Sequence, residues 1–359
     1  MKKLLMTGAA VLGLATAALA GNDREIVVMS WGGAYTKSQV EAYGKPFTAK
    51  TGIKVIWVDA DNPATPIKAQ VEAGNVSVDV ADVERSDAVR LCDEGLLEEL
   101  PVDELPPAPD GTPARDDFIG DSLTDCAVPN IVWSTVVAYD TTRFKEAPKT
   151  IADFFDLAKF PGKRGLRKSA KANLEMALMA DGVPADKVYE VLSTPEGVDR
   201  AFRKLDTIKD QIVWWEAGAQ PPQLLADGEV AMTTAYNGRI FNAMVAENKP
   251  FAILWDGQIM DFDMFVMPKG APHKSDAWEF IKFATDTQRL ADQARYISYG
   301  PARKSSAPLV GKYKDGKTDM KPHMPTAPEN LRNALVNDFE FWADHDTELN
   351  ERFNAWLAQ

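Results

Sequence analysis

The chain alternates between short β-forming runs and helical patterns, and this alternation limits the folds open to it more than any other feature. Strand-like runs are expected at residues 25–31, 53–58 and 78–83, and a segment with helical spacing follows each of them. In the first such segment, Val40, Tyr43 and Phe47 recur at helical intervals. Strands that alternate with helices predict a parallel α/β sheet.

The same alternation resumes in the second half of the chain. Further strands are expected at 165–167, 212–215, 230–235 and 251–255, and a final helix at 343–356. A proline-rich stretch at 101–115 interrupts the rhythm and is expected to form a surface loop. Since 359 residues are too many for a single compact core, we expect two lobes.

Two β-forming segments are longer than an ordinary strand. They span residues 128–139 and 260–267, whereas a typical strand has about 5–6 residues. A segment that passes from one lobe into the other would explain such a length. We therefore predict that these two segments cross between the lobes.

The first twenty residues have the pattern of a signal peptide. Lys2 and Lys3 precede an apolar run, and Ala18-Leu19-Ala20 forms a cleavage site, so cleavage is expected after Ala20. The apolar run has about 16 residues, which is short for a membrane span of ~20. No cysteine follows it to accept a lipid. The sequence predicts a soluble protein exported to the periplasm.

Charge and cysteine content restrict partners and compartment. The formal net charge is −13, so binding to nucleic acid or anionic lipid is not expected. The two cysteines, Cys92 and Cys126, would meet an oxidising environment after export and are expected to form a disulfide. Such a bridge contributes about 3–4 kcal/mol in the chain-entropy description.

The sequence contains no pattern typical of a catalytic or metal site. G-x-S-x-G, H-E-x-x-H, a phosphate-binding P-loop and G-x-G-x-x-G are all absent. The three histidines, His273, His323 and His345, do not have metal-ligand spacing. We expect a binding protein without cofactor or metal, and a secreted hydrolase is the remote alternative.

Several short motifs, in their order, resemble the extracellular solute-binding proteins of ABC transporters, and among these the spermidine/putrescine-binding branch. The matching segments are Ser30-Trp31-Gly32-Gly33, Thr51-Gly52-Ile53-Lys54-Val55, Glu94-Gly95-Leu96-Leu97, Asp227-Gly228-Glu229-Val230, Tyr236-Asn237-Gly238-Arg239 and Tyr299-Gly300-Pro301-Ala302.

The resemblance implies a two-lobed type II periplasmic-binding-protein fold, with strands crossing at the hinge and a ligand cleft between the lobes. We expect residues 21–134 and 264–305 to form lobe 1, and residues 135–263 and 306–359 to form lobe 2. The implied protein is a monomer that binds a small amine and delivers it to permease subunits in the inner membrane.

An amine ligand needs aromatic walls for its methylene groups and carboxylates or ring faces for its ammonium groups. By resemblance, Trp31, Tyr236 and Tyr299 would be aromatic walls, although Trp31 could also be a core residue. Gly32 would let the backbone approach the ligand or simply make the turn. Tyr35 either points into the cleft or packs on its helix.

Acids are expected at neighbouring strand ends. Asp261 and Asp263 alternate along a strand and therefore share a face. Asp263 matches an amine-binding aspartate of the family, whereas Asp261 stands where the polyamine proteins have a tryptophan. Burying both without a partner would be costly, and a bound cation would relieve that cost. By resemblance, Glu84 and Ser86 also contact the ligand, or else Ser86 caps the next helix and Glu84 is a solvated charge.

Three further residues complete the expected site. Of the neighbours Trp214 and Trp215, one would be core and one would face the cleft, and we assign Trp214 to the cleft. Asn237 and Arg239 follow Tyr236. Arg239 either pairs with a ligand carboxylate or forms a salt bridge within the protein.

One segment departs from the polyamine-binding pattern. Lys168 and Lys171 lie where the polyamine-binding members have two acids for an amine. The expected solute is therefore putrescine- or spermidine-like or, more in keeping with this departure, a smaller zwitterionic amine. Thiamine or an anion are alternatives within the same superfamily. Iron is not expected, because the family's iron binders use adjacent tyrosines and this chain has no such pair.

Overall fold

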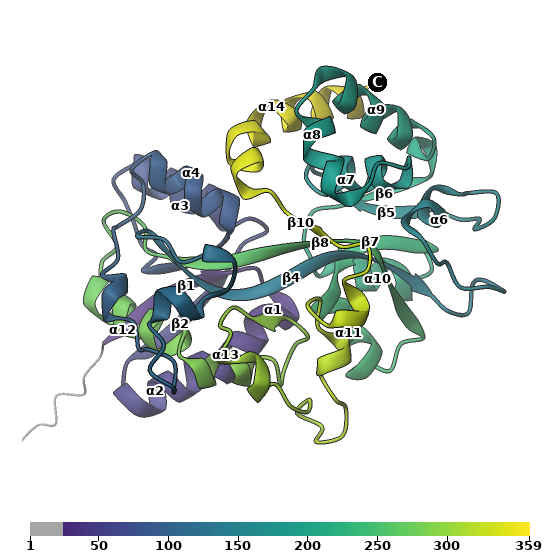
Figure 1. The fold of residues 1–359 in the computed structure, drawn as a ribbon. Helices are drawn as coiled ribbons and strands as arrows, with labels where there is room; N and C mark the ends of the chain where they lie inside the picture. The colour runs from purple at the N-terminus through teal and green to yellow at the C-terminus, as the bar shows by residue number, and fades with distance from the viewer. Residues whose placement is uncertain (1–23) are drawn as a thin grey trace, which may run out of the picture.

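The computed structural model describes residues 24–359, which form one mixed sheet of ten strands with helices on its faces. The strand order is β2-β1-β3-β8-β4-β7-β5-β6, with β10 added beside β8 and β9 beside β4. The predicted signal peptide and its cleavage after Ala20 lie outside the described residues. Figure 1 shows two groups of helices, one around each end of the sheet.

The first group of strands is parallel, as the alternation of strands and helices predicted. It consists of β1 (Glu25–Ser30), β2 (Lys54–Asp59) and β3 (Val80–Glu84), and β1 lies between the other two. The helices that follow these strands are α1 (Gly33–Gln39), α2 (Lys45–Thr51), α3 (Ala64–Glu72) and α4 (Arg85–Asp93). A π-helical turn, η1 (Val40–Gly44), joins α1 to α2.

The second group of strands is also parallel. It consists of β5 (Arg164–Arg167), β6 (Ile212–Trp215) and β7 (Met232–Tyr236), with β5 in the middle. Its helices are α6 (Ile151–Phe155), α7 (Asn173–Ala180), α8 (Val188–Leu192), α9 (Pro195–Asp206), α10 (Gln220–Ala226) and α11 (Asn237–Val245).

Two long antiparallel strands join the groups. They are β4 (Ala127–Asp140), with 14 residues, and β8 (Phe251–Val266), with 16 residues. One end of β8 pairs with β3, and the far end of β4 pairs with β7, so both strands run from one lobe into the other (Figure 1). The predicted pair of crossing strands is therefore present. The exact residues at which each lobe begins and ends stay a prediction.

One expected break in β8 does not occur. The sequence suggested separate strands at 251–255 and 260–267, but the residues between them continue the same strand. The register against β4 shifts between Thr135 and Val137, and β8 bulges there. Gly257 has φ of +77°, a conformation that glycine adopts easily, and this lets the strand bulge without ending.

The last part of the chain adds elements to each lobe in turn. Its elements are α12 (Lys274–Ala284), α13 (Thr287–Gln293), β9 (Gly300–Pro301), β10 (Leu335–Val336) and α14 (Phe339–Leu357). Short helical turns complete the fold: η2 (Val102–Glu104), α5 (Ala114–Asp117), η3 (Ile119–Asp121), η4 (Ala185–Lys187), η5 (Lys209–Gln211), η6 (Ala307–Leu309), η7 (Lys321–His323) and η8 (Pro328–Asn330).

Each lobe has its own hydrophobic core. One core contains Phe47 and Phe280 beside β1, and another contains Phe154, Phe202 and Trp342 around α7, α9 and α14. A smaller cluster of mainly aromatic side chains lies where the lobes meet: Tyr35, Ile131, Trp133, Trp215, Tyr236, Ile297 and Tyr299. Two separate cores with an aromatic cluster between them are the framework for a cleft.

Cys92 in α4 and Cys126 beside β4 form the predicted disulfide, with Cα atoms 6.0 Å apart. No helix within residues 24–359 is both long and apolar enough to cross a bilayer. Within the same residues, no three His, Cys, Asp or Glu side chains are placed so that they could hold a metal ion.

Candidate ligand-binding site

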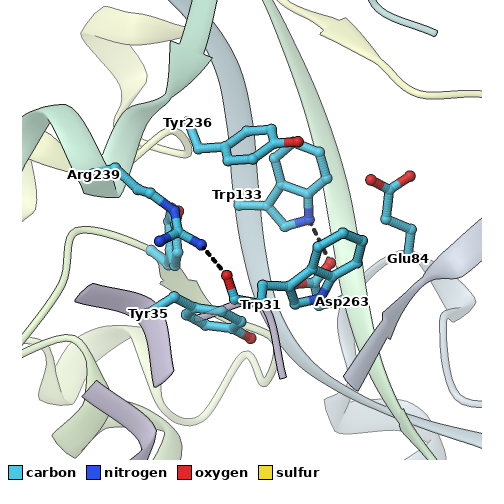
Figure 2. Close-up of a pocket in the computed structure, with 8 residues that line it drawn as sticks. Trp31, Tyr35, Glu84, Trp133, Tyr236, Arg239 and Asp263 are labelled. Atoms are coloured by element: carbon cyan, nitrogen blue, oxygen red, sulfur yellow. Dashed lines mark hydrogen bonds between the residues drawn. The ribbon is translucent and has the colours of Figure 1, made fainter. Parts of the chain in front are cut away.

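A pocket lies between the lobes, where the ends of β1, β3 and β7 approach the middle of the crossing strands (Figure 2). Its lining residues are Trp31, Tyr35, Glu84, Trp133, Tyr236, Arg239, Asp263 and Tyr299. The strand register explains the convergence, because Glu84 lies opposite Asp263, Trp133 opposite Asp261, and Tyr236 opposite Thr135. Neighbouring residues in register share a face of the sheet.

The lobes are in direct contact around this pocket, so the cleft is closed. Arg239 of α11 donates to the carbonyl oxygens of Trp31 and Gly32, each at 2.8 Å, and these residues follow β1 in the other lobe. The remaining cavity has a volume of about 20 Å³. That is enough room for roughly one water molecule, so a larger solute fits here only if the lobes or the lining side chains move apart.

Aromatic rings form the walls of the pocket. The rings of Trp133 and Tyr236 are in edge-to-face contact with centroids 5.0 Å apart, and Trp215 contacts Tyr236 in the same way at 5.5 Å. On the opposite side, Tyr35 and Tyr299 are 5.4 Å apart. Such interlocked rings are rigid, cover methylene groups well and present π-faces that attract a cation.

Asp263 is the acid in this aromatic surrounding. Its Oδ1 accepts a hydrogen bond of 2.7 Å from Trp133 Nε1, which Figure 2 shows as a dashed line. Burial raises the pKa of Asp263 well above its ordinary value, and the nearby carboxylates of Asp82, Glu84 and Asp261 raise it further. A positive charge in the pocket would therefore stabilise the ionised form of Asp263.

Asp82 lies deeper on the same face and orients Tyr35. Its Oδ2 accepts from the Tyr35 hydroxyl at 2.8 Å and from Asn130 Nδ2 at 2.8 Å. Burial raises the pKa of Asp82 to about 7, although these hydrogen bonds oppose the shift. The network fixes the position of one aromatic wall.

Glu84 is neutralised from the second lobe. Its Oε2 accepts from Lys171 Nζ at 2.7 Å, and its Oε1 lies 3.4 Å from Arg167 Nη1. Burial alone would raise the pKa of Glu84, but Lys171 and Arg167 outweigh burial and lower it. Glu84 is therefore an ionised bridge between the lobes as well as a wall of the pocket.

Arg239 depends on a glycine turn. Gly33 has φ of +60°, and a Cβ atom there would lie 2.7 Å from Arg239 Nη1. Any side chain at this position would push the guanidinium away from the two carbonyl oxygens that it contacts. The Gly32-Gly33 pair thus makes the turn and also leaves space for the arginine.

Three buried N–H groups around the seam have no hydrogen-bond partner among residues 24–359. They are Arg239 Nε, Trp31 Nε1 and Trp215 Nε1. An unpaired buried donor costs about 1–3 kcal/mol. Two of these residues, Trp31 and Arg239, line the pocket itself. Two residues with an unpaired donor therefore line the pocket together with its acid and aromatic rings.

Comparison with known proteins identifies the family. Residues 42–326 match the family model for bacterial extracellular solute-binding proteins. The chain belongs to this family. Its members are solute-binding proteins of ABC transporters rather than enzymes, in agreement with the sequence-based prediction.

Individual relatives cover almost the whole solute-binding protein. The γ-aminobutyric acid (GABA)-binding protein of Pseudomonas aeruginosa is 46% identical over 350 residues, which are 97% of this chain and 96% of the relative. The structure of a GABA receptor is 36% identical, with a TM-score of 0.78 and coverage of 94% and 98%. An ABC transporter substrate-binding protein from Bradyrhizobium japonicum is 33% identical, with a TM-score of 0.81 and coverage of 93% and 99%.

Most of the site residues predicted for this solute-binding protein come together. Seven line the pocket: Trp31, Tyr35, Glu84, Tyr236, Arg239, Asp263 and Tyr299. Gly32 contacts Arg239 through its carbonyl oxygen rather than facing the pocket. Asn237 is buried and ties three segments together, because its side chain accepts from the Ser134 N–H at 3.0 Å and donates to the Ser298 carbonyl at 2.6 Å.

Asp261 and Ser86 do not line this pocket. Both contact Lys171 Nζ, Asp261 Oδ2 at 2.8 Å and Ser86 Oγ at 3.2 Å. The expectation that a bound cation relieves the burial of both aspartates is therefore wrong for Asp261, because a lysine of the protein already neutralises it. The hypothesis of an acid that needs a cation remains for Asp263.

Trp214 was the wrong choice of the two tryptophans. Its ring packs on Phe353 at 5.4 Å and on Trp356 at 6.1 Å, inside the core beneath α14. Trp215 points the other way and joins the aromatic seam. The alternation of side chains along β6 was expected, but the direction of each ring depends on where α14 packs.

Sequence reasoning missed Trp133, Trp215 and the contacts of Lys171. Trp133 lies in the middle of a crossing strand, and its face is decided by its register against Asp261 on β8. No pattern in the local sequence predicts that register. A tryptophan near the centre of a strand expected to cross between lobes was the one available signal.

Proposed function

We propose that this protein is the periplasmic solute-binding component of an ABC importer for a short zwitterionic amine of the GABA type. The observation that carries the proposal is that one pocket has both an acid that suits a cation and N–H donors that suit an anion. Asp263 and the aromatic rings suit an ammonium group, while the unpaired N–H groups of Arg239 and Trp31 suit a carboxylate.

The ammonium end of the ligand would lie beside Asp263, between the ring faces of Trp31, Trp133 and Tyr236. Charge-assisted hydrogen bonds to a buried carboxylate are about twice as strong as neutral ones. The rings add cation–π attraction and exclude water.

The carboxylate end would lie beside Arg239 and Trp31. The Nε–H of Arg239 and the indole N–H of Trp31 both lack a protein acceptor among residues 24–359. A carboxylate oxygen supplies that acceptor. Ligand binding would therefore remove the cost of two buried N–H groups without a hydrogen-bond partner. The Arg239 guanidinium would then hold the lobes together through its two terminal NH2 groups and donate its Nε–H to the ligand carboxylate.

The relatives support this ligand class. The names of two of them include GABA, at 46% and 36% identity. GABA has one ammonium and one carboxylate separated by methylene groups, which matches a pocket with an acid, a basic donor and aromatic walls. An anionic solute without an amine would meet the buried carboxylates of Asp263 and Glu84.

In transport, the lobes would open and close about the crossing strands. The protein is exported by its signal peptide, binds its solute as a monomer when the lobes close, and presents the closed form to permease subunits in the inner membrane. The contacts of Arg239 and Lys171 between the lobes are the bonds that stabilise that closed form.

Isothermal titration of the purified mature protein tests the proposal. GABA should bind, n-butylamine and butyrate should each bind much more weakly, and putrescine should bind more weakly than GABA. n-Butylamine lacks the carboxylate and butyrate lacks the ammonium, so each leaves one side of the pocket without a partner. The expected loss of affinity is at least about tenfold. Absence of binding by GABA and by its longer and shorter homologues would refute the proposed ligand class.

A further inference from the structure

A second small cavity adjoins the pocket and shares Glu84, Trp133 and Tyr236 with it. Its volume is also about 20 Å³. Lys171 and Asp261 line this second cavity. The two cavities are neighbouring parts of one elongated cleft, with Asp263 near one part and the Lys171 side chain in the other.

The ammonium group of Lys171 is fully coordinated by protein oxygens. Its Nζ lies 2.7 Å from Glu84 Oε2, 2.8 Å from Asp261 Oδ2 and 3.2 Å from Ser86 Oγ. A primary ammonium has three N–H donors, and three acceptors surround this one. Its side chain is only 10% exposed, and that of Asp261 is 3% exposed. This is the environment of a bound alkylammonium ion.

The backbone around Lys171 is held in an unfavourable conformation. Ala172, the next residue, has φ of +69°, which costs a non-glycine residue about 1–3 kcal/mol. Asn173 Nδ2 fixes the loop by donating to the carbonyl oxygens of Arg167 at 2.7 Å and Ser169 at 2.8 Å. The surrounding structure thus compensates the strain in the loop that carries Lys171.

We infer that Lys171 is a specificity-determining residue: its ammonium occupies the place that the second ammonium of a diamine would take, and it limits the site to ligands with one positive charge. The inference rests on the proposed function, since it names the feature that separates zwitterionic amines from diamines in the same cleft.

Electrostatics explains the selectivity. Glu84 and Asp261 are the acids that a second ammonium would need, and both are already neutralised by Lys171. Arg167 adds another positive charge 3.4 Å from Glu84. A diamine would therefore place its far ammonium beside two cations without a free carboxylate, and burial of such a charge is strongly unfavourable. A zwitterion avoids this conflict because it has a single ammonium.

Replacement of Lys171 by methionine tests the inference, because methionine fills similar space without charge. Titrations with putrescine and with GABA are compared for wild type, Lys171→Met and Lys171→Arg. Putrescine affinity should rise at least about tenfold in Lys171→Met, since Asp261 would then lose its ion pair and Glu84 would keep only Arg167, at 3.4 Å. Lys171→Arg keeps the charge and should bind putrescine as poorly as wild type.

Lys168→Met is the matched control, because Lys168 is in the same loop but about half exposed and 3.5 Å from the exposed Glu216. It should leave both affinities unchanged. The double variant Lys171→Met/Asp261→Asn removes the buried charge imbalance and should lose most of the gain in putrescine binding. A merely structural lysine would produce neither the gain nor its reversal.

Three results overturn the inference: tight putrescine binding by wild type, no gain in a folded Lys171→Met protein, or an equal gain in Lys168→Met. If Lys171→Met folds only with putrescine present, the diamine has replaced the lysine and the inference stands. If it stays unfolded with putrescine, the inference fails. Failure of wild type to bind any zwitterion would refute the proposed function alone, because the putrescine comparison is independent of GABA.

Discussion

Asp263 differs from the neighbouring acids in the charges that surround it. It is buried, and its side chain accepts a hydrogen bond of 2.7 Å from Trp133 Nε1. Glu84 and Asp261 nearby have Lys171 as their counter-ion, whereas the charges close to Asp263 are mostly negative. Asp263 is therefore the acid that we expect to bind a ligand ammonium, whereas Glu84 and Asp261 bind Lys171.

The Asp263→Asn variant should lose ligand affinity while it keeps its fold. Asparagine retains an oxygen for Trp133 but cannot form an ion pair with an ammonium group. We expect GABA affinity to fall about 10- to 100-fold, because a charge-assisted hydrogen bond contributes about 1.5–3 kcal/mol. Titration calorimetry measures the loss, and Asp125→Asn, at an exposed acid, is the control. Unchanged affinity in Asp263→Asn would exclude an ammonium contact there.

Ligand binding should release protons. Burial and the neighbouring acids raise the pKa of Asp263, so a fraction of this group is protonated without ligand. A bound ammonium lowers that pKa, and the complex therefore holds fewer protons than the free protein. Affinity should increase as pH rises towards the pKa of the free protein. Calorimetry in buffers with different ionisation enthalpies measures the protons, and net proton uptake would contradict this.

Sequence reasoning brought together residues that lie at strand ends, but it misplaced residues whose surroundings depend on distant packing. Asp263, Tyr236 and Trp31 were found through family resemblance and strand alternation. Trp214 was assigned wrongly, because the position of α14 decides which side of β6 is core. Lys171 was noted only as a departure, since its partners come from strands more than eighty residues away in sequence.

At the scale of single elements, the turn between β1 and α1 links the fold to the site. Gly33 makes this turn at φ of +60° and leaves room for the Arg239 guanidinium, which binds the carbonyl oxygens of Trp31 and Gly32. A local backbone conformation is thus coupled to a contact between the lobes.

The Gly33→Ala variant should bind GABA at least about tenfold more weakly, since the added methyl displaces Arg239 from its acceptors. Gly74→Ala is a matched control, because Gly74 has φ of +63° but no atom within 4 Å of its expected Cβ. Both variants should lose about 1 kcal/mol of unfolding free energy from the left-handed backbone. Denaturant titration measures this loss, and equal affinities in the two variants would argue against the role of the turn.

Element type was more predictable than element boundaries. The parallel strands β1, β2 and β3 followed from alternating runs of β-forming and helical residues. The continuity of β8 through Gly257 did not, because a glycine within a strand signals either an end or a bulge. The pairing with β4 decides between them, and that information lies more than a hundred residues away in sequence.

For the whole molecule, the two crossing strands β4 and β8 are the connection about which the lobes would open (Figure 1). The polar contacts that join the lobes include those of Arg239 and Lys171 and the ion pair of Arg90 with Asp346. We expect the ligand-free protein to sample open forms in solution and GABA to shift it towards the closed one. Small-angle X-ray scattering should give a smaller radius of gyration with GABA, and an unchanged value would contradict closure.

The central claim is that one closed pocket holds opposite charges at its two ends. A crystal structure of the complex with GABA tests this most directly. The account predicts the ligand ammonium about 2.7–2.9 Å from the Asp263 carboxylate and the ligand carboxylate beside Arg239 and Trp31. A ligand in the reverse orientation, or one bound away from Asp263, would contradict the account.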